Sequence, residues 1–379
     1  MRAVTRALPP GPIVDAFAVC GDTGVYFSNE RLTLAGAGCA AVLPLPGGLA
    51  GGSGVAAVDG WLSSLERDDL VMLPGTGPVA FGALSFESEA VGALVVPAVV
   101  YGRAADGTEW VTVVDEVPVL EPSREWLLSE VSTPRRIEPA AKLQIVDTQP
   151  ADYRASVVEA TRAIARGELR KVVLARRLLV QTDQPIVASA VLGRMASNEP
   201  SSTAFLIGRS DEAFVGASPE LLVSRRGRGV LSHPLAGTAA LDEQRGAGLL
   251  RSEKDHEEHE LVVSDIARVL DPLCTELVVP GEPALVALHT MAHLGTRIEG
   301  QLMEERGRIP SALELAAALH PTAAVGGVPR DEALTLIRTL EPGPRGPWAG
   351  PIGWVGANGD GDWMIALRSA TLAATTATI

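Results

Sequence analysis

Short apolar runs separated by turn-forming residues fill the first 145 positions and restrict what this part of the chain can fold into. The sequence contains 39 Gly and 27 Pro in 379 residues, and both are frequent between these runs. Val-rich or aromatic runs bounded by Gly and Pro are typical of β-strands. We therefore expect an antiparallel sheet here, with one helix around Ala56–Glu66 and a surface connection at Pro118–Arg136. The expected strands are Phe17–Cys20, Val71–Leu73, Ala93–Val100 and Trp110–Val114.

After residue 146, helical patterns alternate with strand-like runs. Tyr153, Val157, Ala160 and Ile164 fall on one helix face, and Gly167 ends that helix. The other expected helices are Gly246–Leu270, Ser311–Leu319 and Asp331–Leu340. The expected strands are Leu169–Val180, Ala204–Gly208, Ala213–Gly216, Glu220–Arg225, Gly350–Val355 and Trp363–Leu372.

This order of elements predicts an α+β fold, a two-lobed single domain of antiparallel β-sheets packed against helices. We expect residues 1–145 to form a β-rich N-terminal lobe and residues 146–379 to form the catalytic region. All six His lie after residue 232, so polar chemistry is expected in the second region.

Charge and cysteine content exclude several classes of partner. The formal net charge of −14 disfavours nucleic acid and anionic membranes. The longest apolar runs, such as Ala93–Tyr101, are too short to span a bilayer. Cys20, Cys39 and Cys274 are never in CxxC spacing, which favours a reducing, cytoplasmic location without a zinc site. No signal peptide is evident at the N-terminus.

Two residues are candidates for acid–base chemistry. Lys171 is one of three lysines and lies in an apolar run, where burial favours the uncharged amine that a general base needs. The alternative is a lysine that extends from a strand end into solvent. Glu220 follows Gly216-Ala-Ser-Pro and precedes an apolar strand, where a raised pKa would let it donate a proton. The alternative is an exposed glutamate after a turn.

A second group of residues suggests ligand binding. Asp255 and Glu258 continue the apolar stripe of one helix, and paired carboxylates at this spacing suit Mg²⁺. The alternative is a first helical turn that emerges into solvent. Pro234–Thr238 is a small-residue loop whose amides and hydroxyl could hold a carboxylate. Arg368 lies in an apolar run and requires an anionic partner, which is either a structural acid or a substrate carboxylate.

Eight short segments between Ala151 and Leu372 extend these observations. They are Lys-Val-Val-Leu-Ala-Arg at 171, Gly-Ala-Ser-Pro-Glu-Leu-Leu at 216, Pro-Leu-Ala-Gly-Thr at 234, Ser-Glu-Lys-Asp-x-x-Glu-His at 252, His-Leu-Gly-Thr at 293, Leu-His-Pro-Thr-Ala-Ala-Val-Gly-Gly-Val-Pro at 319, Arg-Gly-Pro-Trp-Ala-Gly-Pro-Ile-Gly-Trp at 345 and Ala-Leu-Arg-Ser-Ala at 366. In this order they resemble the chorismate-utilising enzymes, which include isochorismate, anthranilate, aminodeoxychorismate and salicylate synthases. Among these the sequence is most similar to isochorismate synthases of siderophore or menaquinone biosynthesis.

The resemblance implies a chorismate-binding fold, a Mg²⁺ cofactor, chorismate as substrate and a monomer. It implies that Lys171 activates water to attack C2 of chorismate and that Glu220 protonates the departing C4 hydroxyl. Glu258 would bind Mg²⁺ beside Asp255, and Arg368 would bind the enolpyruvyl carboxylate. The remaining residues implied in substrate binding are Gly237, Thr238, His293, Ala324 and Trp348.

The resemblance also separates subfamilies. Members that use ammonia generally carry Gln at the position of Lys171, and salicylate synthases tend to carry Thr near Ala324. Lys171 with Ala324 therefore indicates isochorismate as product. Salicylate formation, amino-chorismate formation and a non-catalytic chorismate-binding role remain alternatives. Trp348 stands where relatives usually carry Tyr or Phe, and the printed sequence reaches Ile379 without the family's final Ala-Gly-Ala-Gly-Ile motif.

Overall fold

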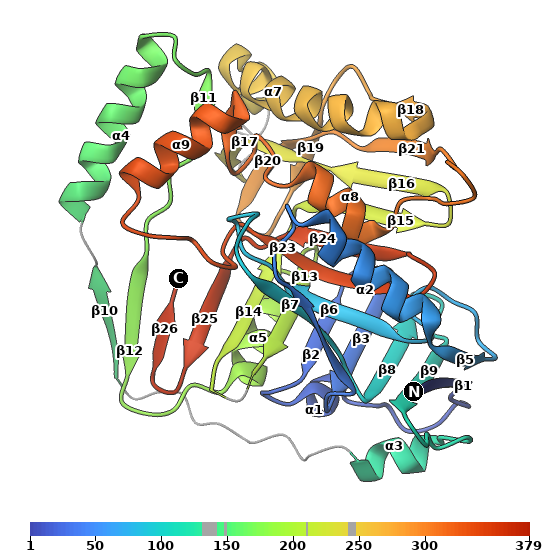
Figure 1. Cartoon of the computed structure of the whole chain (residues 1–379). Coiled ribbons are helices and arrows are strands. Elements are labelled where there is room, and N and C mark those ends of the chain that lie inside the picture. The colour runs from blue at the N-terminus through green and yellow to red at the C-terminus, as the bar shows by residue number, and fades with distance from the viewer. Residues whose placement is uncertain (131–141, 148–149, 210, 242–247) are drawn as a thin grey trace.

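Two large, mainly antiparallel sheets form the centre of the computed structural model, which describes residues 1–130, 142–147, 150–209, 211–241 and 248–379 (Figure 1). The described strands of the first sheet have the order β10 (Leu143–Asp147), β12 (Leu178–Thr182), β26 (Thr376–Thr378), β25 (Ser369–Ala373), β14 (Ala213–Ser218), β13 (Thr203–Gly208), β2 (Val25–Ser28), β3 (Leu32–Ala37), β8 (Val99–Ala104), β9 (Glu109–Asp115), β1 (Arg2–Ala7) and β5 (Glu66–Asp69). The second has the order β18 (Cys274–Val278), β21 (Ile298–Leu302), β16 (Gly229–His233), β15 (Leu221–Arg226), β24 (Gly361–Ile365), β23 (Pro351–Gly356), β6 (Val79–Ala83), β7 (Gly92–Val96) and β4 (Ala41–Leu45).

An aromatic core fills the space between the two sheets. Phe27, Trp110 and Phe205 come from the first sheet, and Phe81 and Trp354 come from the second. All five side chains are buried. Sheets that face each other in this way bury their inner side chains in one shared core.

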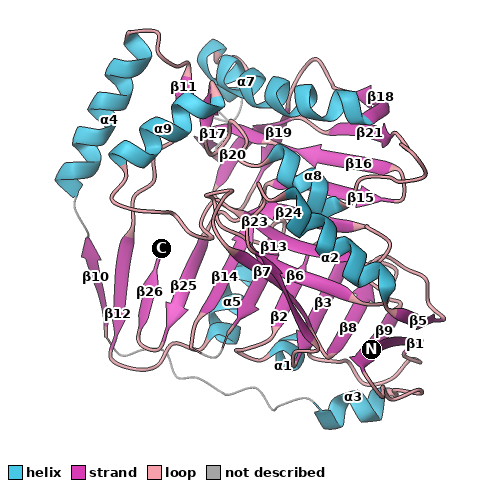
Figure 2. Cartoon of the chain, in the orientation of Figure 1, coloured by secondary structure: helices cyan, strands magenta, loops and turns pink. Residues whose placement is uncertain are grey.

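Helices cover the outer faces of both sheets (Figure 2). The first sheet carries α1 (Ala16–Cys20) and α5 (Ala188–Asn198), and α3 (Arg124–Glu130) adds Leu127 to the same apolar cluster. The second sheet carries α2 (Gly52–Ser64) and α8 (Ala312–Leu319), with α7 (Glu253–Leu270) beside them. None of the helices in the described ranges is long and apolar enough to cross a membrane.

The predicted α+β class of antiparallel sheets packed against helices is confirmed by this arrangement. The helices predicted after residue 150 are present as α4 (Pro150–Ala165), α7, α8 and α9 (Arg330–Leu340), although positions 246–247 of the third prediction lie outside the described residues. Both large sheets combine strands from before and after residue 145. The division into lobes 1–145 and 146–379 therefore stays a proposal about chain organisation.

Two strand predictions in the first region were wrong. Phe17–Cys20 is helical within α1, because the Asp15 carboxylate accepts a hydrogen bond from the Phe17 amide and caps the helix. Val71–Leu73 is a turn. The Asp69 carboxylate accepts hydrogen bonds from the Val71 and Met72 amides, and Met72 has a positive φ of 57°. Side-chain capping outweighed strand propensity in both places.

Several further predictions were wrong in extent. Ala93–Val100 is divided between β7 and β8, with Pro97 and Ala98 between them. Leu169–Val180 is interrupted after β11 (Lys171–Val172), and Trp363–Leu372 is interrupted between β24 and β25. Pro118–Arg136 contains α3, and its residues 131–136 lie outside the described residues. The breaks after β11 and between β24 and β25 lie next to Lys171 and Arg368, which the sequence analysis assigned to the candidate site.

Candidate active site

Lys171 is held by a short ladder between β11 and β22 (Gly327–Val328). Lys171 pairs with Val328 in this antiparallel ladder. The Val173 amide continues it by donating a hydrogen bond to the Gly326 carbonyl at 2.9 Å. A Cβ atom at Gly327 would lie 2.2 Å from the Lys171 carbonyl oxygen, so the approach of the two strands requires glycine.

The Lys171 side chain turns inward to α7. Its Nζ donates a hydrogen bond to Glu258 Oε1 at 2.8 Å, and the lysine side chain is 10% exposed. Ser252 caps the start of α7 by accepting a hydrogen bond from the Asp255 amide, which fixes the first turns of the helix. Lys171 therefore does not extend into solvent, and the predicted base and metal-binding acid are in direct contact.

Glu220 occupies the turn between β14 and β15 and is 4% exposed. Burial raises its pKa to about 8, while the positive charge of Lys171 and a hydrogen bond from the Leu235 backbone oppose that increase. The turn is fixed by hydrogen bonds that the Ile365 amide donates to the Glu220 carbonyl and the Ser218 hydroxyl donates to the Ile365 carbonyl. A carboxyl group with this pKa is protonated at neutral pH and can act as a general acid.

A small-residue strand places further polar groups beside α7. Gly237 lies at an irregularity in the pairing of β17 (Leu235–Ala240) with β20 (Met291–Gly295), and its φ is 75°. A Cβ atom there would lie 3.1 Å from Asp255 Cβ, so glycine permits close packing on the helix. Thr238 Oγ1 and His293 Nδ1 form a hydrogen bond at 2.9 Å across the two strands. Burial and the Arg368 charge lower the pKa of His293.

Arg368 lies at the break between β24 and β25 and not within a continuous strand. Its φ is 47°, and its carbonyl accepts a hydrogen bond from the Ala217 amide. Its Nη1 donates to Glu199 Oε2 at 2.6 Å. Of the two partners that the sequence allowed, the structure contains the structural acid. The sequence analysis missed Glu199, which follows the end of α5 and carries no motif of its own.

Ala324 and Trp348 border the apolar cluster around α7 and α8. Both are partly buried, and Trp348 lies beside the Arg345 guanidinium, with 5.4 Å between the guanidinium carbon and the ring centre. Arg345 is buried and was quoted as part of a motif without a role. It is the second polar residue near the site that the sequence analysis missed.

Comparisons with known proteins identify the group to which this arrangement belongs. A family model described as chorismate binding enzyme matches residues 6–379. The chain belongs to the chorismate-binding enzyme family. MenF of Mycobacterium tuberculosis is 38% identical over 315 residues, which cover 79% of this chain and 77% of that protein. Isochorismate synthase DhbC of Bacillus subtilis is 40% identical over 235 residues, or 59% of this chain and 58% of that protein.

Solved structures of the same family share the fold. The crystal structure of DhbC from Bacillus anthracis has a TM-score of 0.76 at 28% sequence identity and covers 94% of this chain and 88% of that chain. MenF, the menaquinone-specific isochorismate synthase from Escherichia coli, has a TM-score of 0.80 at 22% identity and covers 100% of this chain and 87% of that chain. These similarities confirm the predicted fold class.

The chorismate-binding family implies a magnesium ion, and the donor atoms here fit an open site for it. Glu258 and Asp255 lie three residues apart near the start of α7 and offer carboxylate oxygens. Mg²⁺ commonly takes one or two protein carboxylates and completes its octahedron with water and substrate. Within the described ranges, no cluster of three or more His, Cys, Asp or Glu forms a closed metal cage. The ligand assignment therefore stays a proposal.

A buried hydrogen bond made by His259 holds α7 against the neighbouring chain segment. The His259 side chain is buried, and its Nε2 forms a hydrogen bond with Thr296 Oγ1 at 2.7 Å. Burial lowers its pKa to about 4, so the imidazole is neutral at physiological pH. Because Glu258 is the preceding residue, this contact also limits rotation of the helix face that carries the predicted metal ligands.

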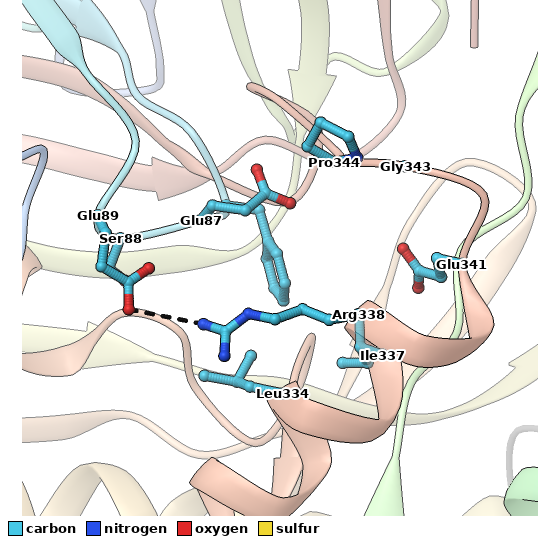
Figure 3. Close-up of a pocket in the computed structure, with 10 residues that line it drawn as sticks. Glu87, Ser88, Glu89, Leu334, Ile337, Arg338, Glu341, Gly343 and Pro344 are labelled. Atoms are coloured by element: carbon cyan, nitrogen blue, oxygen red, sulfur yellow. Dashed lines mark ion pairs between the residues drawn. The ribbon is translucent and has the colours of Figure 1, made fainter.

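A pocket of about 320 Å³ lies between the segment Phe86–Glu89 and α9, and its lining contains neither Lys171 nor Glu220 (Figure 3). Arg338 and Glu89 form an ion pair across it at 3.5 Å. Its lining residues are Phe86, Glu87, Ser88, Glu89, Leu334, Ile337, Arg338, Glu341, Gly343 and Pro344. One of these lining residues, Glu341, contacts the chain segment that follows Lys171. Its Oε1 accepts a hydrogen bond from the Ala175 amide at 2.8 Å.

Proposed function

We propose that this chain is an isochorismate synthase that converts chorismate to isochorismate, with addition of water at C2 and loss of the C4 hydroxyl. The observation that carries the proposal is the burial of Glu220, which raises its pKa to about 8 while the charge of Lys171 opposes that increase. A carboxyl group that keeps its proton at pH 7, beside an amine, supplies the acid and base that this reaction needs. The names of MenF from M. tuberculosis and DhbC from B. subtilis, which both include isochorismate synthase, support the same reaction.

In the proposed reaction, Lys171 Nζ accepts a proton from the water that attacks C2. Glu220 donates its proton to the oxygen leaving C4, so one water is added and one is released. Each such proton transfer typically contributes about 10²–10⁴-fold to a rate. The buried position of both side chains keeps competing water away from the transferred protons.

The other predicted residues would bind and orient the substrate. Arg368 would exchange its Glu199 partner for the enolpyruvyl carboxylate, since a guanidinium pairs equally with a substrate carboxylate. The β17–β20 segment with Gly237, Thr238 and His293 would line the other side, with Ala324 and Trp348 completing the site. Glu258 and Asp255 would hold Mg²⁺, which when bound stabilises negative charge on the substrate carboxylate at C1.

The proposal is tested by chromatography of the products after the chain is incubated with chorismate and Mg²⁺, with and without ammonium. We expect isochorismate in both conditions. Lys171→Ala and Glu220→Gln should each lose the product. Lys254→Ala is the matched control because Lys254 is exposed on the same helix that Lys171 contacts, and it should retain the product.

Other products would refute the proposal and identify the alternative. Salicylate with pyruvate would indicate a salicylate synthase, and a nitrogen-containing product that depends on ammonium would indicate an amino-chorismate synthase. Binding of chorismate without turnover, unaffected by Lys171→Ala, would indicate a non-catalytic homologue. We further propose a cytoplasmic location, in keeping with the three unpaired cysteines, and a monomer, as the family resemblance implies.

A further inference from the structure

The strand that carries Lys171 is too short to fix the side chain by itself. β11 and β22 contain two residues each. The hydrogen bonds that extend this ladder run from the Arg170 amide to the Val328 carbonyl and from the Val173 amide to the Gly326 carbonyl. An isolated pair of short strands is only marginally stable. The position of Lys171 therefore depends on contacts from elsewhere in the chain.

Arg345 supplies contacts at the end of this ladder. Its Nη2 donates to the Val173 carbonyl at 2.6 Å, and its Nη1 donates to the Val325 carbonyl at 2.8 Å. Val173 follows Lys171 by two residues, and Val325 precedes Gly327 by two residues. One guanidinium thus joins both chains of the ladder next to the predicted base.

Glu341 completes the network. Its Oε2 accepts a hydrogen bond from Arg345 Nε at 2.9 Å, and its Oε1 accepts from Arg345 Nη2 at 2.5 Å and from the Ala175 amide at 2.8 Å. The two side chains are 2% and 5% exposed. Phe86 covers the guanidinium face, with 4.0 Å between the guanidinium carbon and the ring centre. Figure 3 shows Glu341 at the side of the neighbouring pocket.

This geometry requires the planar fork of arginine. Two carbonyl oxygens and a carboxylate receive hydrogen bonds from three different nitrogens of one side chain. Lysine has one nitrogen with a compact charge and cannot reach acceptors spread around a plane. A lysine at this position would keep the charge balance with Glu341 and lose the bridge between the two chains.

We infer that Arg345 is a positioning residue that holds Lys171 in place through Val173, Val325 and Glu341. The inference rests on the proposed function for its kinetic readout. A second readout, the acetylation rate of individual lysines, needs no turnover. The sequence contains three lysines, at 142, 171 and 254, so each can be followed separately.

A second buried arginine provides a matched control. Arg124 is 4% exposed and donates hydrogen bonds to the Pro9 and Pro12 carbonyls and to the Glu109 carboxylate. Its partners therefore have the same chemistry as those of Arg345, but they lie in the segment before α1 and in β9. Arg124→Lys should destabilise the fold in the same manner without touching the Lys171 ladder.

The experiment compares Arg345→Lys, Glu341→Gln and Arg124→Lys in the full chain. The measurements are thermal unfolding, kcat and KM for chorismate, and acetylation rates of the three lysines under trace acetic anhydride, read by peptide mass spectrometry. We expect Arg345→Lys to lower kcat by about 100-fold, since displacement of a reacting group by about 1 Å costs this much. KM should stay within about twofold, because Arg345 would not contact the substrate. The acetylation rate of Lys171 should change several-fold, whereas that of Lys254 should not.

The outcomes distinguish a structural role of Arg345 from a positioning role, and they test the proposed function separately. If Arg345→Lys and Glu341→Gln lower the unfolding temperature as Arg124→Lys does but leave Lys171 acetylation at the wild-type rate, Arg345 is structural and the inference fails. If Lys171 acetylation changes in Arg345→Lys and Glu341→Gln alone, the inference holds. Absence of isochorismate from the wild-type chain would refute the proposed function, while the acetylation comparison would still decide the role of Arg345.

Discussion

Replacement of Glu220 by glutamine isolates the effect of the buried proton on folding. Glutamine has nearly the shape of a protonated glutamate and cannot ionise. Burial raises the pKa of Glu220 from an ordinary value of 4.5 to about 8. The folded state therefore binds this proton more tightly than the unfolded state does. Its contribution to stability is complete below about pH 4.5 and is lost as the pH rises through about 8.

The magnitude follows from these two values. Each unit of difference between the folded and unfolded pKa corresponds to about 1.4 kcal/mol. The wild-type protein should therefore lose about 3 kcal/mol of unfolding free energy between pH 4 and pH 7 through this group, and about 5 kcal/mol by pH 9. Glu220→Gln lacks this dependence, so its stability relative to wild type should rise by about 4 kcal/mol between pH 5 and pH 9.

Urea unfolding followed by circular dichroism at several pH values in this range measures the difference directly. Groups that titrate in both proteins, such as His259 and Asp59, cancel when the two curves are subtracted. Lys171→Met provides an internal check, because loss of its positive charge should raise the pKa of Glu220 further. A constant stability difference between Glu220→Gln and wild type from pH 5 to pH 9 would refute the reasoning.

Three other predictions concern the proposed reaction. The kcat of the wild-type chain should fall as the pH rises above about 8, because the acid Glu220, whose pKa is raised to about 8, then loses its proton. A flat pH profile of kcat up to pH 9.5 would contradict this. Glu199→Gln should lower KM for chorismate about fivefold with little change in kcat, because the substrate no longer competes with a carboxylate for Arg368. An unchanged KM would place Arg368 outside the substrate site. Gly327→Ala should lower kcat about 100-fold, because its Cβ would displace the Lys171 carbonyl. Gly326→Ala is the control, because the nearest atom to its Cβ would be the Thr322 carbonyl oxygen at 3.3 Å.

Local patterns in the sequence predicted much of the secondary structure. The amphipathic helices α4 and α7 were found because one face repeats at helical spacing. Lys171 and Glu220 were selected because each is an ionisable residue next to an apolar run, and the structure buries both. The contact of Lys171 with Glu258 was not predicted, since 87 residues separate them and only the fold brings them together.

The missed features depend on contacts between distant segments. The positive φ of Arg368 follows from how the chain passes from the second sheet to the first, and no local residue signals it. Glu199 lies 169 residues from Arg368, and Val173 lies 172 residues from Arg345. A sequence read by its periodicity contains no information about such partners, which the tertiary fold alone brings together.

The proposed acid and base form a coupled pair. Burial raises the pKa of Glu220, and the charge of Lys171 opposes that increase, so the value of about 8 is a balance of two effects. When two groups interact in this way, protonation of one depends on the position and charge of the other. Any contact that fixes Lys171 therefore also sets the protonation of Glu220. The Arg345–Glu341 network would then control both halves of the reaction, and Arg345→Lys should displace the pH at which the Glu220-dependent stability is lost.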